Sequence, residues 1–225
     1  MKHGRSWLSA LLISFSILSF AQKEPVDYVN TIIGASTSAE AGKSGHGLGK
    51  TFPGSCTPFG LVQLSPDTRL LGWDACSGYY YDDTSIMGFT HTHLSGTGIG
   101  DYGDILFMPV VGEKPLIAGT AENPDEGYRS RFSHEQESAR PGYYQVLLQD
   151  DSINVELTAT LRAGLHRYTY PKASDARLIV DMEPTIHGHQ HPVTQIRVVN
   201  DSTIAGMKYT VCLLYTSPSP RDRQK

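Results

Sequence analysis

Residues 88–104 combine imidazole and carboxylate side chains with closely spaced glycines. Up to Leu94 the stretch alternates as a β-strand does, which predicts that His91 and His93 lie on one face. From Ser95 the glycines predict a loop whose backbone can come close to a bound molecule. A rigid strand that leads polar side chains into such a loop is a common way to build a binding site. The alternative is a polar strand followed by a long turn, and the pattern alone leaves both open.

A tryptophan and two carboxylates stand beside further glycines. Asp101 lies within the glycine loop, and Trp73 and Asp74 lie in the turn-rich segment 72–83. An exposed indole offers a flat apolar surface to a sugar ring, and its N–H can donate a hydrogen bond. We therefore expect Trp73 to contact a ligand. The alternative is a tryptophan packed partly into the core, because most aromatic residues pack.

Histidines recur twice at alternating positions, which raises the question of a metal site. His91 and His93 form one set, and His187, His189 and His191 form the other. Alternating imidazoles on a strand can bind zinc or copper when a further ligand completes the coordination sphere. Neither set has a Cys or Glu nearby to complete it. The sequence therefore favours hydrogen-bonding roles for the first set and an incidental loop for the second.

Short strands are the elements that would carry these residues. Apolar alternation and turn chemistry predict many strands, and no strong amphipathic helix is present. The predicted strands are 60–65, 86–94, 104–111, 142–149, 152–161, 164–170, 176–182, 193–199 and 203–210. Many short strands with few helices indicate an all-β fold, namely an antiparallel β-sandwich.

Shorter segments carry further predictions. The tyrosines at 79–81 are expected to alternate across a strand, with at least one packed inward. Asp104 is expected to cap the start of its strand. Phe132–Ala139 is expected to form a helical turn, and 112–127 is expected to be a surface excursion because it is rich in turn-forming residues.

The two ends of the chain differ from its middle. Residues 1–21 have a basic start, a short apolar stretch and small residues before Gln22, which predicts a cleaved signal peptide and a periplasmic or secreted protein without a membrane span. Residues 212–225 are interpreted as a non-native tail, because 212–222 match the translation of a transposase-type sequencing adapter. The alternative is a native Ser/Pro-rich tail. The first interpretation leaves 22–211 as one domain and predicts that the natural protein continues.

Charge and cysteine content narrow the classes of partner. The formal net charge is −4, and residues 22–211 are more acidic still, because the two ends hold five Lys or Arg residues but only one acidic residue. An acidic surface argues against nucleic acid or an anionic membrane as the partner. Cys56 and Cys76 could pair in an oxidising compartment. The favoured interpretation is a packed thiol beside the site.

Several blocks of the chain, in order, resemble the N-terminal domain of glycoside hydrolase family 92, the calcium-dependent exo-α-mannosidases. The matching blocks are Phe-Pro-Gly-x-x-x-Pro-Phe-Gly, Leu-Ser-Pro-Asp-Thr, Cys-Ser-Gly-Tyr and Thr-His-Leu-Ser-Gly-Thr-Gly. The resemblance covers about residues 26–211. It implies a β-sandwich that packs against an (α/α)6 helical barrel, and it implies that the two domains together form the active site.

The resemblance also implies roles for residues. Both catalytic carboxylates are expected in the helical domain, so no catalytic residue is assigned here, and calcium is expected to be held mainly by that domain. The residues expected to contact a mannose-containing glycan are Trp73, Asp74, Cys76, His93 and Asp101. Among them, Trp73 is expected to shape the subsite next to the released sugar, and Asp101 to order its loop or bind a sugar hydroxyl.

Three functions remain open at this stage. The first is the N-terminal domain of an exported α-mannosidase that hydrolyses glycans with inversion and is inactive without its helical domain. The second is a free-standing carbohydrate-binding sandwich, which requires the chain to end near residue 211. The third is a secreted metal-binding protein, which depends on His187–His191 alone.

Overall fold

The computed structural model describes residues 23–36, 50–71, 76–96, 98–172 and 175–211. The predicted signal peptide and tail lie outside these ranges, as do Trp73 and Asp74. The helices within the described ranges are short 3-10 turns, η1 (Pro25–Tyr28), η3 (Pro124–Glu126), η4 (His134–Gln136) and η5 (Ile186–Gly188). No helix in these ranges is long and apolar enough to span a membrane.

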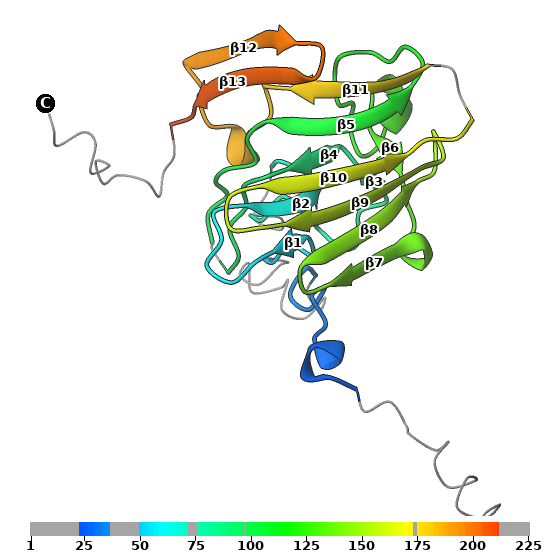
Figure 1. Cartoon of the computed structure of the whole chain (residues 1–225), viewed down its shortest axis with the longest axis vertical. Helices are drawn as coiled ribbons and strands as arrows, with labels where there is room; N and C mark the ends of the chain where they lie inside the picture. Colours follow the sequence, from blue (N-terminus) through cyan, green and yellow to red (C-terminus); the bar gives the residue numbers. More distant parts are fainter. Residues whose placement is uncertain (1–22, 37–49, 72–75, 97, 173–174, 212–225) are drawn as a thin grey trace, which may run out of the picture.

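Two antiparallel sheets form the body of the domain (Figure 1). The first has the order β1-β2-β4-β5-β11 and consists of β1 (Ser55–Cys56), β2 (Gln63–Asp67), β4 (Gly88–Thr90), β5 (Leu106–Val111) and β11 (Ala176–Asp181). The second has the order β10-β9-β8-β7 and consists of β7 (Glu137–Arg140), β8 (Tyr143–Leu148), β9 (Ile153–Ala159) and β10 (Gly164–Thr169). The predicted all-β antiparallel sandwich is confirmed.

The core lies between these two sheets. Strand β9 alternates so that Ile153, Val155 and Leu157 are fully buried while the residues between them are more accessible. The first sheet contributes Leu64 and Phe89 from its own inner face. Period-two alternation places one set of side chains inward from each sheet, and burial of this apolar surface is the main force that holds the layers together.

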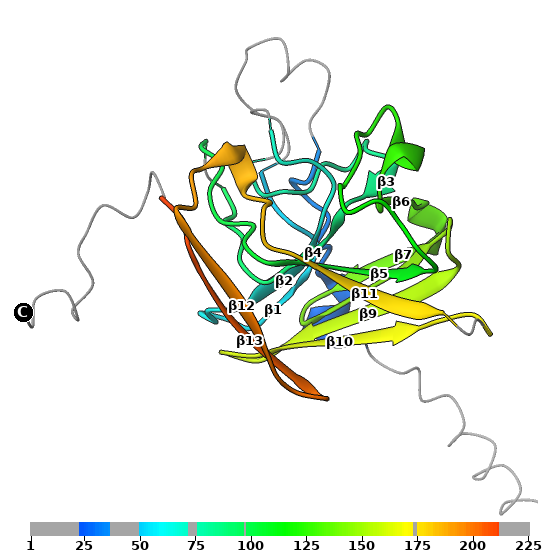
Figure 2. The ribbon, with the colours of Figure 1, turned by 90° about the horizontal axis from the view of Figure 1, so that it is seen from above.

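Two pairs of strands stand outside the main sheets. Strands β3 (Ser85–Ile86) and β6 (Ser130–Arg131) form a short ladder. Strands β12 (Val193–Asn200) and β13 (Thr203–Tyr209) form a hairpin that runs along one side of the sandwich (Figure 2). Every residue of β12 is exposed. The buried ammonium of Lys208 binds the hairpin to the rest of the domain. It donates to Pro184 O at 2.6 Å and lies 3.3 Å from Asp104 Oδ1.

Most strand predictions are confirmed, with shifts of a few residues at the ends. The largest error concerns 86–94, because the strand stops at Thr90. Beyond Thr90 the regular register ends, because His91 O accepts from Gln63 N out of register and the His93 side chain turns inward toward Gln63 O and Asp67.

Three smaller predictions were wrong in part. Tyr79–Tyr81 do not form a strand, although Tyr79 is fully buried as expected. The turn within Phe132–Ala139 covers only η4, and strand β7 begins at Glu137. Asp104 does not cap a strand: β5 begins at Leu106, and Asp104 instead accepts a hydrogen bond from Thr210 Oγ1 at 2.6 Å.

Candidate functional site

The sequence blocks singled out above converge where β2 and β4 end. Asp67 is the last residue of β2, and His93 follows β4 by three residues. Their side chains are fully buried, and His93 Nε2 lies 3.0 Å from Asp67 Oδ1. This pair joins two blocks that are 26 residues apart in the sequence.

The ring of His93 is fixed by its hydrogen bonds. Nδ1 donates to the carbonyl oxygen of Gln63 at 2.6 Å, because a carbonyl can only accept. Nε2 lies 3.0 Å from Thr90 Oγ1 as well as 3.0 Å from Asp67. The ring and the Asp67 carboxyl group therefore belong to one buried hydrogen-bonded cluster. Removing one partner leaves a buried polar group without its hydrogen bond, which lowers stability.

The segment after Asp67 is a loop, and hydrogen bonds join its two ends to form a base. Thr68 N donates to Gly78 O at 2.7 Å, and Tyr80 N donates to Thr68 Oγ1 at 2.9 Å. The buried guanidinium of Arg129 donates to Thr68 O at 2.7 Å. Gly78 has a φ of +83°, and a Cβ there would overlap the Asp67 carboxylate, so glycine is required for two reasons. Trp73 and Asp74 lie between these residues in the sequence, outside the described ranges.

The glycine loop is anchored by a buried isoleucine. A Cβ at Gly100 or Gly103 would lie within 2.7 Å of Ile186 side-chain carbons. Ile186 is itself almost completely buried, and its backbone N–H donates to Tyr102 O at 2.9 Å. The two glycines therefore allow η5 to pack directly on the loop, a close approach that explains part of the glycine spacing.

Asp101 is fully buried at this contact. Its Oδ1 accepts from the adjacent Tyr102 N–H at 2.9 Å and lies 3.8 Å from His189 Nε2. His189 donates to Gly100 O at 2.9 Å. His189 was not predicted to belong to the site, because 187–191 was interpreted as an incidental loop. Only the alternating histidines there signalled structure, and no spacing rule connects them with residue 101.

His91 and His93 point to different environments, so the prediction that they share one face was wrong. His91 Nε2 lies 3.1 Å from Nε2 of His166, which comes from β10 of the opposite sheet. His166 also receives a hydrogen bond at Nδ1 from the Tyr168 hydroxyl at 2.7 Å. Burial lowers the pKa of His166 to about 3 and also lowers that of His91, and the proximity of another imidazole adds to both shifts. Both rings are therefore neutral at physiological pH.

The cysteines do not form a disulfide. Cys76 is buried and Cys56 is exposed, and both are free thiols. The expectation of a packed thiol is confirmed for Cys76, next to Ser77 at the base of the loop, and was wrong for Cys56. The role of Cys76 as a substrate contact remains a prediction.

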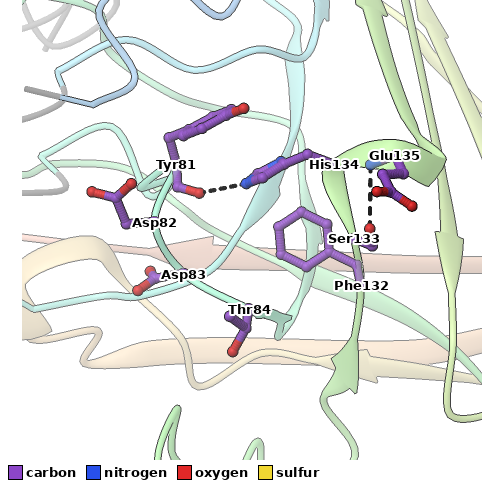
Figure 3. A pocket seen from close by; sticks show the side chains of 8 residues that line it. All are labelled: Tyr81, Asp82, Asp83, Thr84, Phe132, Ser133, His134 and Glu135. Carbon is purple, nitrogen blue, oxygen red and sulfur yellow. Dashed lines mark hydrogen bonds between the residues drawn. The ribbon is translucent and has the colours of Figure 1, made fainter.

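A separate depression of about 480 Å³ opens beside η4 (Figure 3). The His134 ring stacks on Tyr81 with 3.9 Å between centroids, and Figure 3 shows its Nε2 directed at the Tyr81 carbonyl oxygen, 2.7 Å away. His134 Nδ1 lies 2.6 Å from the buried carboxylate of Glu137. Both ring nitrogens of His134 are thus already engaged, so we assign no ligand to this depression.

Glycoside hydrolysis needs two carboxyl groups on opposite sides of the bond to be cleaved. Asp67 and Asp101 are both buried inside the described part of the domain. Nor do the described residues bring together three or more His, Cys, Asp or Glu side chains that could hold a metal. A calcium ion therefore does not fit this part of the chain, and no chemical step is derived through one.

Comparison with known proteins gives a consistent result. The family model for the glycosyl hydrolase family 92 N-terminal domain matches residues 28–216. The solved structure of the family GH92 α-mannosidase BT3965 from Bacteroides thetaiotaomicron, in complex with mannoimidazole, is 44% identical and has a TM-score of 0.75. The similarity covers 82% of this chain and 23% of that one.

More distant relatives extend this result. The family GH92 inverting mannosidase BT2199 from the same bacterium is 30% identical, with a TM-score of 0.54 over 71% of this chain and 20% of that one. A curated relative, an uncharacterized secreted glycosidase of Arthroderma benhamiae, is 27% identical over 153 residues, which is 64% of this chain and 17% of the relative. The chain thus spans less than a quarter of the length of each of these relatives.

Proposed function

Because its match covers residues 28–216, this chain belongs to glycoside hydrolase family 92, and we propose that it is the glycan-contacting N-terminal domain of an exported α-mannosidase. The observation that carries the proposal is the 44% identity and TM-score of 0.75 to a family GH92 α-mannosidase. At that level the domain is the same structural unit, and its site is the natural place to look for a shared role.

The described geometry supports an indirect role in substrate binding, in which these residues position the loops that contact the glycan. The Asp67–His93 pair, the Thr68–Gly78 base and the Ile186 contact fix the two loops that carry the predicted glycan-contacting residues. Rigid loop bases hold contacts in position for a sugar, which reduces the entropy lost on binding. We propose that Trp73 contacts the sugar that neighbours the released mannose and that Asp74 also contacts the glycan.

The remaining parts of the reaction are proposed to lie outside this chain. The general acid, the general base and most calcium ligands would come from the C-terminal region that the relatives have beyond the matched part. Hydrolysis would proceed with inversion, with the two carboxyl groups about 6.5–9.5 Å apart to admit a water. The predicted signal peptide supports a periplasmic or secreted location, and the curated relative is also named as secreted.

The experiment that tests the function begins with the complete reading frame in the source DNA. The protein it encodes is expected to release mannose from α-linked mannose disaccharides, and residues 22–211 alone are expected to release none. A stop codon directly after residue 211 with retained sugar binding would instead support a free-standing carbohydrate-binding domain. A complete protein that cleaves no α-mannoside would contradict the proposal.

A variant tests the role of Trp73. In the complete enzyme, Trp73→Ala should weaken cleavage of a mannose disaccharide more than cleavage of an activated aryl mannoside, because the indole is proposed to contact only the neighbouring sugar. The loss should be on the order of 1–3 kcal/mol in transition-state binding. Tyr28→Ala, which removes an exposed aromatic ring in η1, is the control and should change neither rate. Equal losses on both substrates would contradict the assigned subsite.

A further inference from the structure

The contact between the two sheets brings together two imidazoles that the proposed function does not use. His91 directly follows β4 of the first sheet, and His166 lies in β10 of the second sheet, close to β4 in Figure 1. Their Nε2 atoms are 3.1 Å apart. The Phe107 ring contacts both imidazoles, and both histidines are partly exposed, so water can reach the pair.

The orientation of the two rings is poor for a simple hydrogen bond between them. A hydrogen bond directed along both ring axes would place the ring centroids about 5.4 Å apart, given ordinary imidazole dimensions. The centroids are only 4.8 Å apart, and the ring planes differ by 42°. The ring axes therefore do not both lie along the line that joins the two nitrogens.

We propose that His91 Nε2 and His166 Nε2 together bind one divalent transition-metal ion. A bend shared equally by the two rings aims both nitrogens at one point about 2.1 Å from each, which is the length of a metal–imidazole bond. The angle at that point is then about 95°, which suits the tetragonal geometry of Cu²⁺ better than the tetrahedral geometry of Zn²⁺. Cu²⁺ also has the highest affinity among the divalent first-row metals. Water would fill the remaining coordination positions.

Two neighbouring residues suit this role. The Tyr168 hydroxyl lies 2.7 Å from His166 Nδ1. When Nε2 binds a metal, the ring proton is on Nδ1 and donates to that oxygen, and a contact of this kind usually orients a ligating imidazole. Gly164 leaves room for the other ring, because a Cβ there would lie 2.6 Å from His91 Cδ2 and 2.8 Å from its Nε2.

This site is independent of the proposed glycan-binding role, because it requires only the contact between the two sheets. It differs from a calcium site in its ligands, since calcium prefers oxygen and this pair offers nitrogen. A metal held there would join the end of β4 to β10 by coordinate bonds. It would therefore link the two layers of the sandwich.

Copper binding by the complete protein tests the proposal. Cys56 is replaced by Ser in every sample, because an exposed thiol also binds copper. Metal-stripped protein is dialysed against Cu²⁺ with excess Ca²⁺, which keeps oxygen-ligand sites filled, and the bound copper is counted by mass spectrometry. This parent protein is expected to hold one equivalent of copper more than its His166→Gln or His91→Gln variant. Its electron paramagnetic resonance spectrum should show nitrogen couplings that both variants lose. Equal copper content in all three proteins would overturn the proposal.

Two further variants separate a built site from incidental coordination. His191→Gln removes a partly exposed histidine from another loop and should hold as much copper as the parent protein. Copper lost from this variant but not from His166→Gln would overturn the proposal. Tyr168→Phe keeps both ligands and the aromatic ring, so it should bind copper about 10–100-fold more weakly than the parent. Unchanged affinity in Tyr168→Phe would also overturn the proposal.

Thermal unfolding separates loss of the site from loss of the fold. Each variant is first unfolded without metal, and Tyr168→Phe carries the test if a glutamine variant does not fold. Added Cu²⁺ should raise the Tm of the parent protein and leave that of His166→Gln unchanged, since an ion that binds only the folded state stabilises it. The same rise in both proteins would assign the copper to incidental surface groups and overturn the proposal.

Discussion

Two hairpins of similar length behave in opposite ways in this molecule. In β8–β9, alternate residues are buried on both strands, and the hairpin is the centre of its sheet. In β12–β13, nearly every residue is exposed, including Val198 at 78% and Tyr209 at 59%. The sequence predicted both as strands from the same kind of alternation. Alternation therefore reports the extended backbone and not whether a partner covers either face.

The difference lies in the neighbours of each hairpin. Strand β9 pairs with β8 and β10 and also packs on β1 and β2 across the core. Strand β12 pairs only with β13 among the described residues. An isolated two-stranded hairpin is marginally stable in water. The contacts that hold it include those of Lys208, whose buried ammonium joins Asp104 and Pro184.

Matched isoleucines measure this contrast most directly. Ile153→Ala in β9 should lower the free energy of unfolding by about 2–5 kcal/mol, because it removes a fully buried side chain and leaves a cavity. Ile196→Ala in β12, where the side chain is 51% exposed, should change it by less than about 0.5 kcal/mol. Both values come from denaturant titrations of the same chain. Equal losses would mean that the hairpin is packed in solution, and the contrast would fail.

Acid should weaken the sandwich through the histidine pair between its sheets. The folded-state pKa of His166 is lowered to about 3, mainly by burial, and that of His91 is lowered as well. A lowered histidine pKa gives stability that is complete above the unfolded-state value of about 6.5 and is lost as pH falls toward the folded-state value. Each group can contribute a slope of at most about 1.4 kcal/mol per pH unit. Tyr168 and Phe107 contact the pair, and His93 acts on His91 electrostatically.

Unfolding measured between pH 6.5 and 4.5 tests this prediction. The His166→Gln variant should lose less stability across that interval than the wild type, since Gln can keep a hydrogen bond but does not titrate. His191→Gln, in the loop before β12, is the control and should follow the wild type. Parallel curves for His166→Gln and wild type would show that this pair does not govern acid sensitivity.

The sequence predicted the fold better than the site. Turn chemistry and alternation located most strands, because both act over a few neighbouring residues. The pairing of His91 with His166 and of His93 with Asp67 depends on how two sheets stack, which no local pattern encodes. The strand ending at Thr90 was missed for the same reason, since a long-range hydrogen bond overrides the local alternation. Glycine spacing did indicate a close approach, but only the structure identifies Ile186 as the group that approaches.

The most local predicted effect is confined to the hairpin. Lys208→Met removes the ammonium that holds β13 to Asp104 and Pro184, and the unbranched apolar side chain of methionine keeps most of the buried volume. Losing these charge-assisted bonds should free the hairpin by roughly 1–3 kcal/mol in local opening, which amide hydrogen exchange of residues 193–209 would record as faster exchange. Exchange in β8 and β9 should not change, because no contact of Lys208 reaches those strands. Arg197→Met in β12 is the matched control, since it removes a cation from the exposed surface of the same hairpin. Faster exchange throughout the sandwich in Lys208→Met would show that the two regions unfold together, and the hairpin would then belong to the core's cooperative unit despite its exposure.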